Sequence, residues 1–154
     1  MRNFDYIKEL GFDDLYHYCS SAEENQVSDP ELSAFNARRA LEYMVRELYL
    51  MKGIEISERT SLFQLVEDES FTSFINDAKV LQAVHYIRKV GNLGAHAMNV
   101  TRRESFFCLL NIYNVVGAIL LKLRIVQSVA PFDRSLIPDK AGIHVTPPAD
   151  IKVS

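Results

Sequence analysis

An uncharged, strongly apolar stretch at residues 106–121 restricts the fold of this chain more than any other feature. It is only 16 residues long, and Asn111, Asn114 and Gly117 interrupt it. A helix that crosses a bilayer needs about 20 apolar residues, and shorter apolar helices are more often buried in a protein core. We therefore expect this stretch to be the central core helix of a soluble protein, and we expect no membrane segment.

Helical patterns fill most of the chain before the apolar stretch as well. Apolar residues recur at helical spacing after Ser28, which is a suitable N-cap because Pro30 and Glu31 follow in the first turn. This helix is expected to end near Lys52, since Gly53 is a natural residue for a helix end. Alternating runs of β-branched residues, which are typical of strands, do not occur before residue 127. The sequence therefore predicts an all-α domain.

Glycines divide the helical pattern at two further places. Gly11 separates the first 27 residues into two short helices or one kinked helix. A later helix is expected over residues 79–90, after which Gly91 and Gly94 interrupt the apolar pattern. These interruptions leave open whether the helix stops at residue 90 or continues through the glycines.

The last long helix and the end of the chain differ sharply in pattern. Thr101 and Glu104 have the spacing of a capping box, and the helix that they open is expected to run to about residue 126. Beyond it the chain has several prolines and no helical period. We therefore expect a helical bundle over residues 1–126 and an extended tail or linker over residues 127–154, which leads to a partner or a downstream module.

Composition narrows the classes of protein to which the chain can belong. Hydrophobic residues make up 48% of 154 residues, which is enough to bury the core of one domain. The net charge of -3 argues against a dedicated nucleic-acid binder, which is normally basic. Cys19 and Cys108 have no CxxC spacing, and the first residues lack the apolar stretch of a secretory signal. A reducing cytoplasm is the expected compartment.

Two groups of polar residues are candidates for a site. Arg38 and Glu42 are four residues apart, so they share a helix face with apolar neighbours and can pair. Arg88, Asn92 and His96 are also spaced by four, and they share one side if their helix continues through the glycines. A guanidinium, an amide and an imidazole in that arrangement can bind a phosphate or cleave a phosphodiester. The alternatives are a surface ion pair and a hydrogen-bonded cluster that joins two helices.

No cofactor and no metal site are expected from the remaining motifs. His17, His85 and His144 form no ligand pattern with His96, and the chain has no HExxH motif or usable cysteine pair. It also has no glycine-rich phosphate loop after a strand and no Gly-x-Ser-x-Gly elbow.

Two segments carry a family resemblance: ARRALE at residues 37–42 and IRKVGNLGAH at residues 87–96. Together with the apolar helix that follows, they resemble a bacterial domain of unknown function related to HEPN domains, over about residues 5–125. The resemblance implies an up-and-down helical bundle that often pairs into dimers. Such domains lie near the N-terminus of the R subunits of type I restriction enzymes and in other defence proteins. Residues 131–138 look like the linker that leads there into a nuclease and an ATP-driven motor.

The resemblance also raises a nuclease hypothesis. Active HEPN ribonucleases use an arginine and a histidine a few residues apart, usually as a composite site across a dimer. In this sequence seven residues separate Arg88 from His96, and Gly91 stands about where the catalytic arginine would be expected. The chain therefore departs from the catalytic pattern at the position that matters most.

Two functional hypotheses follow. The first is a non-catalytic accessory or interaction domain of a type I restriction R subunit, whose parent protein would be a site-specific deoxyribonuclease. Such a domain would contact a protein partner or downstream domains of the same polypeptide, can form a homodimer, and would meet DNA only through the parent complex. The polar residues would then form one structural cluster between two helices, namely Arg38, Glu42, Arg88, Asn92 and His96.

The second hypothesis is a metal-independent HEPN-type ribonuclease of a toxin or phage-defence system. Its candidate catalytic residues are Arg88, Asn92 and His96. Gly91 and the wide spacing of Arg88 and His96 favour the first hypothesis over this one.

Overall fold

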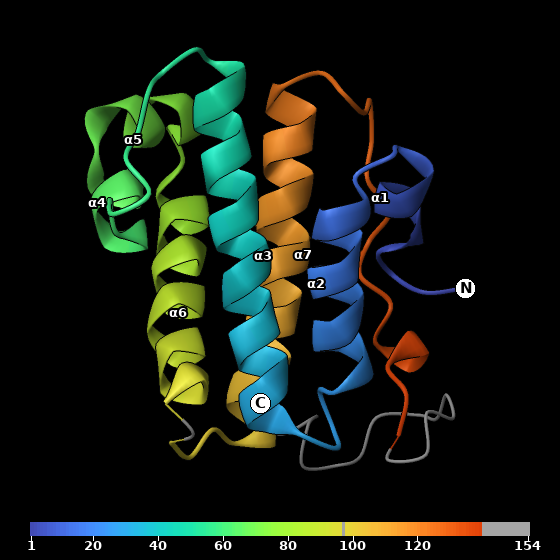
Figure 1. Cartoon of the computed structure of the whole chain (residues 1–154). Coiled ribbons are helices and arrows are strands. Elements are labelled where there is room, and N and C mark those ends of the chain that lie inside the picture. Colours follow the sequence, from blue (N-terminus) through green and yellow to red (C-terminus); the bar gives the residue numbers. More distant parts are fainter. Residues whose placement is uncertain (97, 140–154) are drawn as a thin grey trace.

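Four long helices lie side by side and run alternately down and up (Figure 1). They are α2 (Asp13–Glu24), α3 (Pro30–Met51), α6 (Ala78–Ala95) and α7 (Arg102–Lys122). Three short helices complete the bundle, namely α1 (Asp5–Glu9), α4 (Leu62–Glu67) and α5 (Glu69–Ile75). The computed structural model describes residues 1–96 and 98–139, and these residues contain no β-strand. The prediction of an all-α, up-and-down bundle is confirmed.

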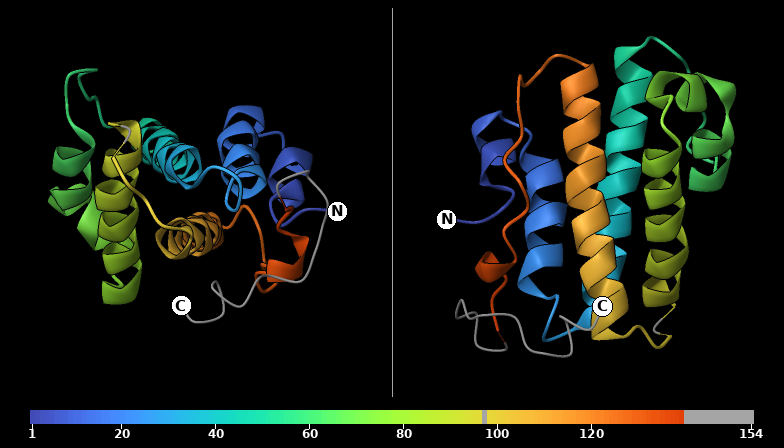
Figure 2. Two further views of the ribbon diagram at one scale, coloured as in Figure 1. Left: turned by 90° about the horizontal axis from the view of Figure 1, so that it is seen from below. Right: turned by 180° about the vertical axis from the view of Figure 1, so that it is seen from behind.

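Helix α3 lies at the centre of the bundle and packs against α2, α6 and α7. Viewed from below, it is flanked by α6 on one side and α2 on the other (Figure 2). Its buried face includes Ala34, Ala37, Leu41 and Val45, which recur at the spacing of one helix face. Helix α6 in turn packs mainly against α3 and α7, with smaller contacts to α4 and α5.

Helix α7 is the helix that the apolar stretch at residues 106–121 predicts. Among the described residues it is the one helix long and apolar enough to cross a membrane, by length and composition alone. In the bundle, however, 61% of its most apolar window is buried against other helices. Leu109, Ile112 and Val116 have no exposed surface. This is the arrangement of the core helix of a soluble bundle.

The N-termini of the long helices follow their capping residues. The capping box predicted for Thr101 and Glu104 is present at the start of α7. The N-cap of α3 is Asp29, whose carboxylate accepts a hydrogen bond from the backbone N–H of Leu32 at 3.2 Å. The expectation of Ser28 was one residue too early, because Pro30 is the first helical residue and the cap is the residue directly before it.

Among the described residues, four helices end on a residue in the left-handed conformation, and α5 does so at Asn76, where φ is 45°. Gly11 and Gly53 have φ values of 88° and 71°, so the glycine-based ends expected from the sequence are confirmed. Arg124 does the same at φ 59° after α7, where the backbone N–H of Ile125 bonds to the carbonyl of Leu120. This turn stops α7 at Lys122, four residues earlier than the apolar pattern indicates.

The segment after α7 is extended, as expected, but it lies against the bundle. The Tyr113 hydroxyl donates to the carbonyl of Ala130 at 2.6 Å, and the Phe132 ring packs on Tyr113 with centroids 5.3 Å apart. A short 3-10 helix (Arg134–Leu136) follows, and Ile137 is 3% exposed. The residues up to 139 thus contribute to the core that the sequence assigned to residues 1–126. The rest of the expected tail, residues 140–154, lies outside the described residues.

Candidate functional site

The glycines of α6 allow an unusually close approach to α3. A Cβ atom added at Gly91 would overlap the side chain of Arg38 and lie 2.9 Å from the carbonyl oxygen of Ala34. A Cβ atom added at Gly94 would overlap the carbonyl oxygen of Glu31 in the same way. Helix α6 therefore continues through both glycines to Ala95 instead of ending near residue 90, because they form its contact with α3.

Arg38 and Glu42 share a face of α3, as predicted, but their pairing is loose. The closest approach of their charged atoms is 3.9 Å. Glu42 instead accepts a hydrogen bond from Nε of Arg46 at 3.1 Å and also pairs with its Nη2. Arg46 donates a further bond from Nη2 to the carbonyl of Thr60 at 2.7 Å, which fixes the loop between α3 and α4. The main partner of the Glu42 carboxylate is therefore Arg46 and not Arg38.

The partners of Arg88 among the described residues lie on α6 and α4. Its Nε donates to Nδ1 of His85 at 3.3 Å, and its guanidinium stacks over the Phe63 ring at 4.9 Å. His85 in turn donates from Nε2 to Glu67 at 2.8 Å. Both ring nitrogens of His85 thus have a partner in this arrangement.

Asn92 and His96 lie on the surface near the end of α6. His96 is the C-cap residue, and its backbone N–H bonds to carbonyls of the preceding turn. No hydrogen bond or ion pair joins Arg88, Asn92 or His96 to the pair on α3 within the described part of the chain. The structure thus brings Arg38 and Glu42 together, places Arg38 against Gly91, and leaves the other three polar residues apart from them.

A groove between α2 and α3 brings together several arginine and aromatic side chains, unlike the predicted polar cluster. It encloses about 400 Å³, is open to solvent, and is lined by Tyr18, Phe35, Arg38, Arg39, Glu42, Tyr43 and Arg46. The Arg39 guanidinium lies over the Tyr18 ring at 4.8 Å and over the Phe35 ring at 5.6 Å. It also donates to the Tyr18 hydroxyl at 3.0 Å. We call this the arginine groove.

The sequence alone indicated two of the seven residues that line the arginine groove. Arg38 and Glu42 were singled out by their spacing, and Phe35 and Arg39 have the same four-residue spacing on α3. That second spacing is a usable signal that an aromatic ring and a guanidinium share this helix face. Tyr18 lies on α2, and only the packing of α2 on α3 brings it to Arg39.

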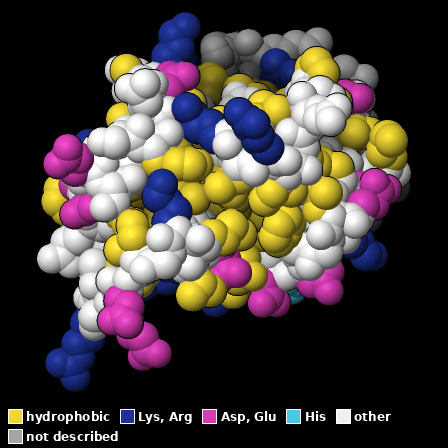
Figure 3. Space-filling model, turned by 90° about the horizontal axis from the view of Figure 1, so that it is seen from above, with side chains coloured by type: hydrophobic (Ala, Val, Ile, Leu, Met, Phe, Trp, Pro, Cys, Tyr) yellow, Lys and Arg dark blue, Asp and Glu magenta, His cyan; other side chains and the backbone are white. Residues whose placement is uncertain are grey.

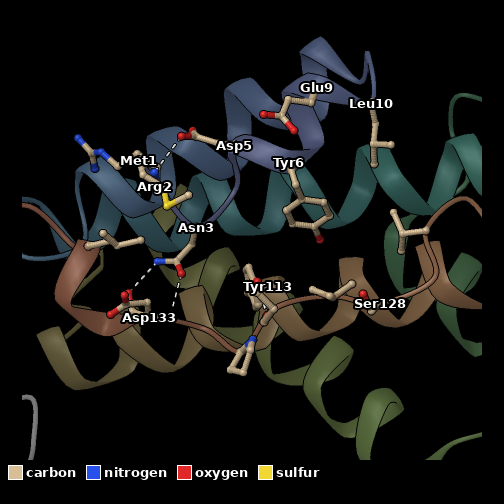
Figure 4. Close-up of a pocket in the computed structure, with 15 residues that line it drawn as sticks. Met1, Arg2, Asn3, Asp5, Tyr6, Glu9, Leu10, Tyr113, Ser128 and Asp133 are labelled. Atoms are coloured by element: carbon tan, nitrogen blue, oxygen red, sulfur yellow. Dashed lines mark hydrogen bonds between the residues drawn. The ribbon is translucent and has the colours of Figure 1, made fainter.

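A second cavity, of about 510 Å³, lies between α1 and the segment after α7 (Figure 4). Tyr6 projects from α1 into the gap toward Tyr113, and its hydroxyl is buried without a hydrogen-bond partner among the described residues. Burial raises the pKa of Tyr6, so the hydroxyl keeps its proton. At one end Asn3 bonds to the backbone of Asp133 in both directions, at 2.8 and 2.9 Å. The two hydrogen bonds between Asn3 and Asp133 therefore join the two walls of the cavity at this end.

Behind that contact lies a fully buried carboxyl group. Oε2 of Glu23 accepts a hydrogen bond from Asn3 at 2.6 Å, whereas its Oε1 has no partner among the described residues. Burial raises the pKa of Glu23 to about 7, against the opposing effects of the Asn3 hydrogen bond and the Arg2 charge. Glu23 lines neither of the two cavities.

Apolar side chains also gather at the end of the bundle where α3 and α7 finish (Figure 3). Exposed apolar residues of the elements that reach this end include Leu10, Met51 and Leu121, at 37%, 48% and 41% exposure. Such a gathering on a soluble domain is typical of a contact surface.

Within residues 1–96 and 98–139 no three histidine, cysteine, aspartate or glutamate side chains are grouped closely enough to hold a metal ion. The cysteines Cys19 and Cys108 are both buried and free. The described residues thus combine a helical bundle with an open groove of arginine and aromatic side chains.

The described residues form a small all-α bundle domain with an open, polar groove along its central helix. The chain belongs to the family described as a domain of unknown function, DUF4145, whose model matches residues 20–127, more than half of the chain. No curated protein and no solved structure matches the chain.

Proposed function

We propose that the chain is a non-catalytic interaction domain. The observation that carries this proposal is the contact between α6 and α3 at Gly91. The position where a catalytic arginine would be expected has no room for a side chain, because a Cβ atom there would overlap Arg38. Arg88 is occupied by His85 and Phe63, and His96 lies exposed at the helix end. A phosphodiester-cleaving site needs these groups to converge on one reacting atom.

The surface of the domain supports a role in binding. The arginine groove presents fixed guanidinium and aromatic groups to solvent, and these are the residue types that dominate protein interfaces. The apolar end of the bundle offers a further contact surface.

On this proposal the domain belongs to a larger cytoplasmic assembly, as the N-terminal part of the R subunit of a type I restriction enzyme. The resemblance of residues 37–42 and 87–96 supports this more specific assignment. The domain would hold the motor and nuclease part, or another subunit, in place, and the parent protein would supply the ATP-dependent DNA cleavage. The domain itself would carry no cofactor.

RNA cleavage tests the central claim. The chain is incubated with labelled RNA in the presence of a chelator, beside a variant that carries both Arg88→Ala and His96→Ala. We expect no cleavage by either protein above the background of a mock preparation. Cleavage by the wild type that the double variant lacks would establish a metal-independent ribonuclease and refute the proposal.

The reading frame tests the assignment to a restriction enzyme. We expect the complete polypeptide to contain a nuclease and an ATP-driven motor downstream of this domain, and to cleave DNA only with ATP. Removal of residues 1–139 should lower its association with the other subunits and leave its DNA-stimulated ATPase intact. A complete polypeptide that ends with this chain would contradict the assignment.

A further inference from the structure

The two neighbouring arginines of the arginine groove are held in place before any partner binds. The stem of Arg38 lies against Gly91, where α6 approaches α3 most closely. The guanidinium of Arg39 is sandwiched near the rings of Tyr18 and Phe35. Fixed side chains lose little conformational entropy on binding, so such groups contribute strongly to affinity.

The groove has more donors than acceptors. Its single carboxylate, Glu42, bonds to Arg46 and stands 3.9 Å from Arg38, which is too far for a hydrogen bond. Nε of Arg38 is buried without a partner among the described residues. Arg39 uses one nitrogen on the Tyr18 hydroxyl. Arg38 and Arg39 line the same groove, and each keeps terminal nitrogens that can donate hydrogen bonds to an incoming oxyanion.

The charges in and around the groove favour a ligand with a single anionic group over a nucleic-acid strand with many phosphates. The seven lining residues include three arginines and one glutamate, so the groove itself is positive. The negative charges of Glu47 and Asp14 act on Tyr43, which also lines the groove, and add to the effect of burial in raising its pKa. A nucleic-acid strand along the groove would bring phosphates against these carboxylates, and the whole chain is negative at -3. A short segment with one acidic side chain avoids this repulsion.

The open shape and the residue types favour a protein segment over a small molecule. Small ligands are usually enclosed in mainly apolar pockets. The arginine groove is open and has tyrosine and arginine in its lining, which are the side chains enriched at the energetic centres of protein interfaces.

We infer that the arginine groove is the docking site for a segment of a protein partner that places an aspartate or glutamate carboxylate on Arg38 and Arg39, with an adjacent uncharged side chain on Tyr18 and Phe35. This inference rests on the proposed interaction function and names the chemistry of its partner.

Peptide pools test the inference on the full chain. One pool of octapeptides has a fixed aspartate or glutamate at its centre and random uncharged residues elsewhere, and the second pool has asparagine or glutamine at that position. Retention of each pool on the immobilised chain is counted by sequencing. We expect the acidic pool to be retained about tenfold better than the neutral pool, because a charge-assisted hydrogen-bond pair differs from a neutral one by about this factor.

Arg39→Gln and Arg103→Gln form a matched pair of variants. Both arginines are exposed on helices and stack on an aromatic ring, since Arg103 lies over Phe107 at 6.0 Å. We expect Arg39→Gln to bring the ratio of the two pools close to one, and Arg103→Gln to leave it unchanged. Equal retention of both pools on the wild type, or retention of neither, would overturn the inference.

A twelve-nucleotide oligothymidylate serves as competitor. Displacement of the acidic peptides by this oligonucleotide at lower concentration than by the acidic pool itself would assign the groove to nucleic acid and also overturn the inference. RNA cleavage measured on the same preparations separates the two claims. Cleavage would refute the proposed function, whereas loss of the acidic preference without cleavage would refute only the partner chemistry.

Discussion

Gly91 and Gly117 are both buried within long helices, yet their surroundings predict opposite effects of a methyl group. At Gly91 the added Cβ would overlap Arg38, so Gly91→Ala should separate α6 from α3 and cost about 1–3 kcal/mol of stability. At Gly117 the nearest atoms belong to Val129 at 3.4–3.7 Å, an ordinary contact distance. Gly117→Ala should therefore be neutral or stabilise the protein by up to about 1 kcal/mol through helix propensity.

Urea unfolding followed by circular dichroism measures both glycine variants. The pair controls for the general effect of replacing a helical glycine. A Gly91→Ala variant as stable as Gly117→Ala would show that the approach of α6 to α3 is looser than the structure has it, and would remove the main argument against a side chain at that position.

A second prediction at the scale of one residue concerns the pH dependence of stability that Glu23 causes. Its pKa is about 7 in the folded chain and near 4.5 when unperturbed, so the folded state binds more protons between these values. The contribution of this group is fully present below pH 4.5, falls as the pH rises to about 7, and levels off above it. The total change is roughly 3 kcal/mol, from the size of the shift.

The Glu23→Gln variant removes this titration but keeps an oxygen that can accept the hydrogen bond from Asn3. We expect the free energy of unfolding of the wild type to decrease between pH 5 and pH 7 more steeply than that of the variant, as measured by urea titration at each pH. Parallel curves for the two proteins would mean that Glu23 titrates normally in the folded state.

At the scale of helices, capping residues and turn glycines predicted most helix ends correctly. The prediction failed where contacts between helices determine the end. The capping box at Thr101 and the turn at Gly53 are local, and both were predicted. The extension of α6 through Gly91 depends on the backbone of α3, which the sequence does not place. The arginine groove shows the same limit, because Tyr18 meets Arg39 only after α2 packs on α3.

Helix α7 offers a prediction about a whole element. Val116 has no exposed surface, so Val116→Asp would bury an unpaired charge and should cost more than about 4 kcal/mol, enough to prevent folding. Asn114→Asp changes an exposed position of the same helix and should alter stability by less than about 0.5 kcal/mol. Leu110 is partly exposed, so Leu110→Asp should fall between them.

Circular dichroism and gel filtration of the three α7 variants check this order. A Val116→Asp variant that folds with the stability of Asn114→Asp would mean that α7 is peripheral to the bundle. The exposed control matters because it keeps the same helix and the same introduced side chain.

At the scale of the molecule, the segment after α7 decides where the folded unit ends. In the sequence, apolar residues recur at helical spacing up to about residue 126. The loss of this spacing beyond residue 126 predicted a tail. The segment nevertheless supplies apolar surface to the core, since Phe132 packs on Tyr113 and Phe106 and Ile137 is buried. Extended chain that packs through a few side chains has no period, so sequence patterns cannot distinguish it from a linker.

Two truncated chains test this boundary. A chain of residues 1–126 would expose Phe106 and Tyr113 and lose the bonds of Asn3 to Asp133, whereas a chain of residues 1–139 keeps these contacts. Burial of the Ile137 side chain is worth roughly 1.5–3 kcal/mol, and the partly buried Phe132 ring adds to it. We expect the shorter chain to unfold at a clearly lower urea concentration than the longer one, with a smaller slope because less surface is buried. Equal midpoints would place the end of the folded unit at residue 126, where the sequence pattern ends, and would make the segment a linker that rests on the bundle without stabilising it.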